Sequence, residues 1–213
     1  MQEEIWVIGD VHGELDLLKE LIDKLPKDAK ICFTGDLIDR GEKSFEVIRF
    51  IMENSYDCVL GNHEIMMNER DYPNWLRNGG QATIDSFKRG TRLEIEEAKE
   101  FISSLPYFNY YDFKDCAPLV VSHSYIHDIW NGEDFIYDER VLFDATWRHM
   151  VNPKQFNPDR ESANNIYNIF GHTVIKKPIV NKHWTMIDAG AFKAKGMLSA
   201  ISYPTMNIVN VKK

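Results

Sequence analysis

The first sixty residues contain three short apolar segments, each followed by a glycine and then an acidic or amide residue. Residues 5–8 and 31–34 are followed by Gly-Asp, and residues 58–60 are followed by Gly-Asn. Between them, residues 18–25 and 44–52 carry leucine, isoleucine and valine at helical spacing. This alternation of short strands with amphipathic helices predicts an α/β fold with a largely parallel sheet. Polar side chains then gather at the carboxyl ends of its strands.

The remainder of the chain is divided by changes in its pattern. A helical insert is expected at about residues 72–115, where apolar residues recur at helical spacing. A strand at residues 118–121 precedes Ser122-His123, and the aromatic and charged region of about residues 124–165 is expected to form irregular loops over the site. Closing antiparallel strands are expected at residues 184–187, 198–202 and 208–211. We find no repeat or linker and predict a single domain over residues 1–213.

Four blocks place Asp, Asn or His beside glycines. In order they are GDVHG at residues 9–13, GDLIDRG at 35–41, GNHE at 61–64 and GHT at 171–173. Asp10 and His12 are two residues apart where a strand ends, so a carboxylate and an imidazole point to the same side and can converge on one cation. Carboxylate, amide and imidazole ligands without thiolates favour manganese, iron or zinc.

A second cation is predicted from the later blocks. Asp36 follows its own strand, so in a parallel sheet it lies alongside Asp10. A carboxylate shared between two cations is the natural bridge for metals roughly 3.5–4 Å apart. Asn62, His123 and His172 then supply neutral ligands. We therefore predict two divalent cations, most simply Mn²⁺, with iron and zinc as alternatives.

The four blocks, together with NWLRNGG at residues 74–80 and IDAGA at 187–191, resemble the metallophosphoesterases of the serine/threonine phosphoprotein phosphatase type. The similarity is strongest to the small bacterial and phage branch, the lambda-phosphatase-like enzymes, and it covers nearly the whole chain. It implies a metallophosphoesterase fold, with central mixed β-sheets packed as a sandwich, flanking helices and an active site at the strand carboxyl ends.

The resemblance also assigns roles to individual residues. It implies that one metal is held by Asp10, His12 and Asp36. The other metal is then held by Asp36, Asn62, His123 and His172. Catalysis is implied for His63 as general acid, oriented by Asp39, with Arg40 and Arg148 as phosphate-binding residues. Three positions depart from the family pattern: Arg148 is displaced by one residue relative to its aromatic neighbour, Leu60 replaces an arginine and Ser122 replaces a cysteine.

The chemistry of a phosphomonoester explains why these residue types suit the task. Its dianion repels an anionic nucleophile, whereas two cations neutralise both and make hydroxide from a bridging water near neutral pH. Direct attack by that hydroxide needs no phosphoenzyme. Arg40 offers a planar fork for two phosphoryl oxygens. His63 protonates the leaving oxygen, a contribution of about 10²–10⁴-fold in rate.

The expected substrates are phosphoserine and phosphothreonine in proteins or peptides, with phosphotyrosine and small phosphoesters as further substrates. Two alternatives stand beside this expectation. The first is a symmetrical dinucleoside tetraphosphate hydrolase, because related enzymes share the same blocks. The second is a non-catalytic module that binds phosphoproteins. The second is disfavoured because every predicted ligand and the general acid are present.

Composition excludes some other functions. The net charge of −8 argues against nucleic-acid binding, which requires a basic surface. The three cysteines are far apart and form no CxxC motif, so no disulfide framework is expected. This pattern is typical of proteins in a reducing compartment. We find no secretory signal and no apolar run long enough to cross a membrane. A cytoplasmic protein without nucleic-acid or membrane partners is therefore expected.

Overall fold

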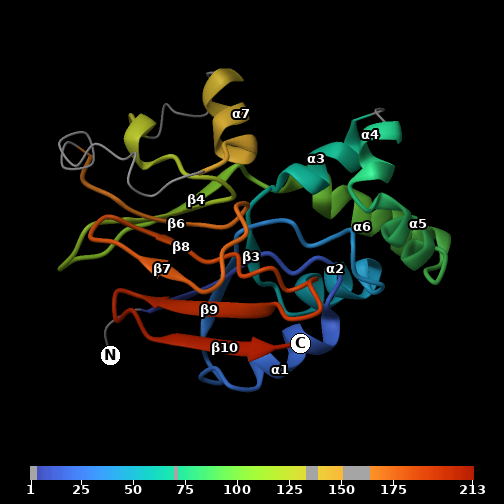
Figure 1. Cartoon of the computed structure of the whole chain (residues 1–213), viewed down its shortest axis with the longest axis horizontal. Helices are drawn as coiled ribbons and strands as arrows, with labels where there is room; N and C mark the ends of the chain where they lie inside the picture. Colours follow the sequence, from blue (N-terminus) through green and yellow to red (C-terminus); the bar gives the residue numbers. More distant parts are fainter. Residues whose placement is uncertain (1–3, 70–71, 133–138, 151–163) are drawn as a thin grey trace.

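Two five-stranded sheets lie face to face at the centre of the structure, with helices outside them (Figure 1). The strand order is β10-β9-β1-β2-β3 in the first sheet and β4-β5-β6-β8-β7 in the second. The structure is a computed structural model that describes residues 4–69, 72–132, 139–150 and 164–213. This arrangement confirms the predicted α/β fold with mixed sheets flanked by helices.

The first sheet is built largely from the predicted strands. It comprises β1 (Ile5–Ile8), β2 (Lys30–Phe33), β3 (Asp57–Cys58), β9 (Met197–Tyr203) and β10 (Ile208–Lys212). The strands β1, β2 and β3 are parallel, whereas β9 pairs antiparallel with both β1 and β10. Helices α1 (Leu15–Ile22) and α2 (Ser44–Glu53) connect the parallel strands and cover the outer face.

The second sheet has a parallel centre. It comprises β4 (Phe108–Tyr111), β5 (Leu119–Ser122), β6 (Tyr167–Phe170), β7 (Ile179–Val180) and β8 (Trp184–Met186). The strands β5, β6 and β8 are parallel, and β4 and β7 pair antiparallel at the edges. The prediction of an antiparallel closing strand at residues 184–187 is therefore right for its pairing with β7 and wrong for its pairing with β6.

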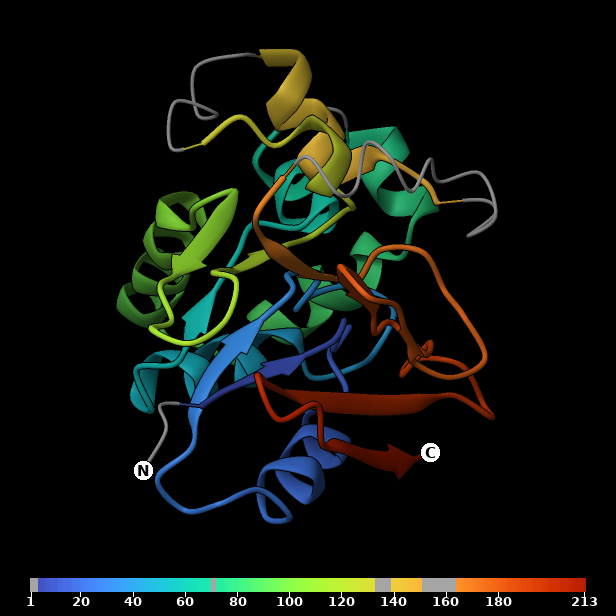
Figure 2. The ribbon, with the colours of Figure 1, turned by 90° about the vertical axis from the view of Figure 1, so that its left-hand side faces the viewer.

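The remaining helices lie beside and above the sheets. They are α3 (Asn62–Asn68), α4 (Tyr72–Arg77), α5 (Gly80–Phe87), α6 (Arg92–Ser104), the 3-10 turn η1 (His127–Ile129) and α7 (Glu139–Trp147). In Figures 1 and 2, α7 lies over the second sheet and α1 under the first. Among the described residues, no helix combines the length and apolar character needed to cross a bilayer.

Two predicted boundaries need correction. The helical insert ends at Ser104, because residues 108–111 form β4, where Phe108 packs against Trp130 with ring centroids 5.1 Å apart. The region of residues 124–165 is not wholly irregular, because it contains η1 and α7. The rest of that prediction falls partly outside the described residues, at 133–138 and 151–163.

Alternation along β1 explains how both faces of the first sheet are buried. Ile5 and Val7 belong to the cluster between the sheets, whereas Trp6 and Ile8 belong to the cluster under the helices. All of β1 is buried, as expected for a strand covered on both faces. The strands β1, β2 and β3 are parallel to one another, as are β5 and β6, and the loops after their carboxyl ends carry the predicted metal ligands.

Candidate metal centre

Backbone strain is concentrated in the loops that leave the strands. The predicted site residues with positive φ are His12 at 47°, Asp36 at 50°, Asp39 at 70°, Arg40 at 68° and His172 at 63°. In the described part of the chain, the other non-glycine residues with positive φ are Ser55 and Met206. Each such residue costs roughly 1–3 kcal/mol and persists where its surroundings hold it in place. The strain therefore supports a functional role for these loops.

Glu64 holds the loop after β2 in this conformation. Its Oε2 accepts from the backbone N–H groups of Asp36 (2.9 Å) and Gly61 (3.0 Å), and its Oε1 accepts from Leu37 (2.8 Å) and Ile38 (3.3 Å). The carboxylate is fully buried, and burial raises its pKa to about 7, with a further contribution from Asp36. One side chain at the start of α3 therefore accepts from three backbone N–H groups of the Asp36 loop and from that of Gly61.

The predicted ligand atoms of Asn62, His123 and His172 converge. Asn62 Oδ1 lies 2.9 Å from His123 Nε2 and 3.0 Å from His172 Nδ1, and the two nitrogens are 3.1 Å apart. His123 Nδ1 donates to the carbonyl oxygen of Thr34 at 2.8 Å, which leaves Nε2 as the lone-pair nitrogen. Burial lowers the pKa of His123 and takes the pKa of His172 to about 3, so both rings are neutral. Three potential ligand atoms thus face one another, an arrangement that suits a bound cation.

Asp36 lies between this group and a second one. Its Oδ1 is 3.4 Å from His123 Nε2, whereas its Oδ2 is 3.6 Å from His12 Nε2 and 3.8 Å from His63 Nε2. His12 Nδ1 donates to the carbonyl oxygen of Ile38 at 2.8 Å, which fixes Nε2 as its lone-pair nitrogen. Burial acts to raise the pKa of Asp36, but His123, His63 and His12 together lower it well below its usual range. The two oxygens of one ionised carboxylate therefore face two ligand groups.

Asp10 lies beside these groups with both oxygens hydrogen-bonded. Its Oδ1 accepts from the Thr34 hydroxyl at 2.9 Å, and its Oδ2 accepts from the His172 backbone N–H at 3.0 Å. Burial raises the pKa of Asp10 well above its usual range, and the charges of Asp188 and Asp36 raise it further. Asp188 Oδ2 is buried without a hydrogen-bond partner among the described residues. Three crowded carboxylates are a further feature that suits bound cations.

His63 and Asp39 form a buried pair. His63 Nδ1 donates to Asp39 Oδ2 at 2.6 Å. Asp39 also accepts from Trp75 Nε1, at 2.9 and 3.0 Å to its two oxygens, and from Thr83 Oγ1 at 2.6 Å. Burial acts to lower the pKa of His63, but the charge of Asp36 and the hydrogen bond and charge of Asp39 outweigh it and raise the pKa. The pair is thus built to orient an imidazole and favour its protonated form.

Arg40 is the exposed member of the site. Its Nη1 lies 2.7 Å from His12 Nε2 and its Nη2 lies 3.0 Å from His63 Nε2. The guanidinium carbon lies 4.2 Å from the centroid of the Phe192 ring, which supports it from one side. The Arg40 backbone N–H donates to the carbonyl oxygen of Gly79 at 3.3 Å, and a Cβ on Gly79 would come within 2.9 Å of that nitrogen. Gly79 therefore packs closely against the backbone of Arg40.

Arg148 is engaged elsewhere. Its Nη1 and Nη2 donate to the two carboxylate oxygens of Asp128 at 2.6 and 2.8 Å, and its guanidinium lies 5.5 Å from the Tyr125 ring centroid. Within the described residues no hydrogen bond links it to the other predicted site residues. The neighbouring His149 lies beside a predicted metal ligand, because its ring centroid is 4.3 Å from that of His172. A phosphate-binding role for Arg148 stays a prediction.

The residues present fit a pair of divalent cations. Two sets of side-chain ligand atoms, His12, Asp36 and His63 in one and Asp36, His123 and His172 in the other, each lie within 4.8 Å of one another. The first set contains His63 where Asp10 was predicted. All donors are carboxylate, amide or imidazole groups, which suits manganese, iron or zinc.

Other residues that build the site were not assigned from the sequence. Glu64, Trp75 and Asp188 stand inside the quoted motifs GNHE, NWLRNGG and IDAGA, so the motifs themselves were their signal. No sequence motif marked Thr83 or Phe192 as part of the site, because their contacts with Asp39 and Arg40 exist only in the folded chain.

The fold and this array of ligands define a metal-dependent phosphoesterase. The chain belongs to the calcineurin-like phosphoesterase family, whose model matches residues 4–190. Members of this family use divalent metals, and the chain is accordingly a hydrolase of the phosphatase class.

Named relatives include two kinds of enzyme. The chain is 28% identical to serine/threonine-protein phosphatase 2 of Escherichia coli over 88% of this chain and 87% of that protein. It is 27% identical to an asymmetrical bis(5'-nucleosyl)-tetraphosphatase of Bacillus subtilis over 96% of this chain and 93% of that protein. A serine/threonine phosphatase structure from Saccharomyces cerevisiae superposes with a TM-score of 0.66 at 15% identity, covering 99% of this chain and 79% of that one, which shows the shared fold.

Proposed function

We propose that this protein is a dinuclear-metal phosphomonoester hydrolase whose substrates are phosphoserine and phosphothreonine side chains in proteins or peptides. The observation that supports it best is the position of Asp36, whose two oxygens face two separate ligand groups. The buried His63–Asp39 pair and the exposed Arg40 lie on the Oδ2 side of that carboxylate. Metal ligands, a proton donor and an anion-binding group are thus side by side.

Each group has a distinct task in this proposal. We propose that two divalent cations, most simply Mn²⁺, bind at Asp36 and the surrounding ligands. When bound, they supply positive charge to the phosphoryl oxygens and lower the pKa of the attacking water. The planar guanidinium of Arg40, whose Nη atoms lie beside His12 and His63, binds two phosphoryl oxygens of the substrate. His63 holds a proton for the leaving oxygen, and Asp39 keeps its ring in position through Nδ1.

Partners and location belong to the same proposal. We propose phosphorylated proteins or peptides as partners, with neither nucleic acid nor membrane among them, because the chain carries a net charge of −8. A cytoplasmic location is proposed because Cys32, Cys58 and Cys116 are all free thiols in the structure.

A second candidate is hydrolysis of dinucleoside tetraphosphates. It is favoured by the Bacillus subtilis relative, whose name specifies the asymmetrical reaction and whose alignment spans 96% of this chain. The sequence-based alternative was a symmetrical hydrolase, so the named relative changes the products expected from diadenosine tetraphosphate. Asymmetrical cleavage yields ATP and AMP, whereas symmetrical cleavage yields only ADP.

Parallel kinetics with manganese separate these candidates. The proposal predicts a higher kcat/KM for a phosphoserine or phosphothreonine peptide than for diadenosine tetraphosphate. A clear preference for the dinucleotide would transfer the assignment to the second candidate, and chromatography of its products would identify the cleavage position. Absence of turnover with all phosphoesters, para-nitrophenyl phosphate included, would favour the non-catalytic binding module.

A further inference from the structure

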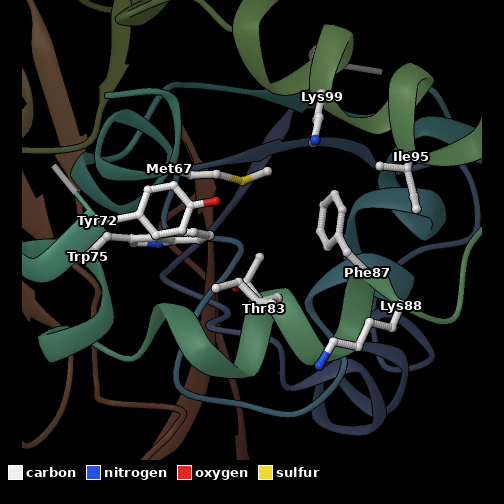
Figure 3. A pocket seen from close by; sticks show the side chains of 9 residues that line it. Met67, Tyr72, Trp75, Thr83, Phe87, Lys88, Ile95 and Lys99 are labelled. Carbon is white, nitrogen blue, oxygen red and sulfur yellow. The ribbon is translucent and has the colours of Figure 1, made fainter. Parts of the chain in front are cut away.

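A cavity of about 320 Å³ lies among helices α3 to α6 (Figure 3). We call it the helical pocket. Its apolar walls come from Met67, Tyr72, Trp75, Phe87 and Ile95. The rings of Tyr72 and Trp75 meet edge to face, with centroids 5.6 Å apart at 82°. A volume near the lower end of small-molecule sites, with aromatic walls, suits a ligand of one or two fused rings.

The helical pocket shares two wall residues with the catalytic pair. Trp75 and Thr83 line the cavity, and both donate hydrogen bonds to the Asp39 carboxylate, at 2.9 and 2.6 Å respectively. Trp75 is only 4% exposed and Thr83 only 1%, so each is fixed between the cavity and Asp39. A ligand that packs on the indole ring therefore contacts a side chain that holds the carboxylate which orients His63.

Two lysines give the helical pocket a positive rim. Figure 3 shows Lys99 extending from α6 toward the interior of the cavity, and Lys88 at the end of α5 on another side. The Lys88 ammonium is 2.6 Å from Asp85, so its charge is already paired. Lys99 makes no ion pair within the described residues, although the protein as a whole carries a net charge of −8. The charge that Lys99 presents to the cavity complements an anionic group.

We propose that the helical pocket binds a small aromatic carboxylate, with its ring between the apolar walls and its anionic group at Lys99, and that occupancy changes turnover through Trp75 and Thr83. This site uses none of the residues that bind metal or phosphate in the proposed function. Ligand binding at the pocket is independent of that function, whereas the effect on turnover rests on it.

Calorimetric titration tests binding without any assay of activity. The probes are naphthoate and its neutral analogue naphthalene methanol, and the variants are Lys99→Met, Ile95→Trp and the matched control Lys88→Met. Loss of one exposed ion pair predicts that Lys99→Met weakens naphthoate binding about threefold to fivefold. Its affinity for the neutral analogue is expected to stay unchanged. Lys88→Met has a smaller effect because Lys88 is already paired.

Filling the cavity provides an independent measurement. Ile95→Trp is expected to abolish binding of both probes, while its circular dichroism spectrum and unfolding transition stay like those of the wild type. In a separate competition experiment, inorganic phosphate is expected not to displace naphthoate from the wild type. The binding proposal is overturned if naphthoate does not bind, if phosphate displaces it, or if both Lys99→Met and Ile95→Trp bind it as the wild type does.

Turnover of para-nitrophenyl phosphate then tests the coupling. Saturating naphthoate is expected to change kcat in the wild type and to leave kcat unchanged in the filled Ile95→Trp variant. If naphthoate binds the wild type without any change in kcat, the coupling to the catalytic pair is refuted. If the wild type has no phosphoesterase activity, the proposed function fails, whereas the calorimetric result still decides whether the pocket is a binding site.

Discussion

Replacing Glu64 by glutamine tests how the strained Asp36 loop is held. The carboxylate accepts four backbone hydrogen bonds, two at each oxygen, from Asp36 and Gly61 and from Leu37 and Ile38. Glutamine keeps one acceptor oxygen, so two buried N–H groups lose their partner and face an amide N–H₂ group. At about 1–3 kcal/mol for each unsatisfied group, the free energy of unfolding is expected to fall by about 2–6 kcal/mol.

Urea unfolding followed by circular dichroism measures this loss. The assay is made at about pH 8, above the pKa of about 7 that burial gives Glu64, and with chelator so that metal binding does not contribute. Glu100→Gln, at an exposed position of α6, is the matched control and is expected to change stability by less than about 0.5 kcal/mol. The manganese affinity of Glu64→Gln is expected to fall about 10–100-fold. Wild-type stability and affinity in this variant would refute the role assigned to Glu64.

Further substitutions separate the tasks within the site. His63→Asn is expected to lower kcat by about 10²–10⁴-fold while metal analysis still finds wild-type content, and unchanged turnover would remove His63 from the acid role. Trp75→Phe deletes one donor to the orienting carboxylate and is expected to lower kcat about fivefold without altering metal affinity. Arg40→Lys is expected to reduce kcat/KM for a phosphopeptide about tenfold. Arg148→Lys, at an arginine paired with Asp128, should cost less, and an equal loss would place Arg148 at the phosphate.

The loops that carry the metal ligands could be predicted from the sequence because each is marked by a short local motif. A β-branched or apolar run predicts a buried strand, and the Gly-Asp that follows residues 5–8 or 31–34 predicts a polar turn at the sheet edge. Since parallel strands end at one edge, the sequence alone predicted that Asp10 and Asp36 lie side by side. His123 and His172 were likewise found beside the ends of predicted strands, and the structure brings their ring nitrogens to 3.1 Å.

The remaining features depend on contacts between distant segments. Glu64 bonds to backbone groups 26 to 28 residues earlier in the chain, and nothing in its own helix indicates this. Phe192 supports Arg40 from a loop near the end of the chain. The pairing of β8 with β6 was missed for the same reason, because a three-residue strand carries no signal that specifies its neighbour.

The central claim is that Asp36 and the ligands around it bind two divalent cations on which hydrolysis depends. The most direct test is turnover of a phosphothreonine peptide by chelator-stripped protein as manganese is added in known equivalents. No turnover is expected without metal, followed by a rise that levels off at two equivalents per chain, in agreement with the metal content after dialysis. Full turnover in metal-free protein, or saturation at a single equivalent, would contradict it.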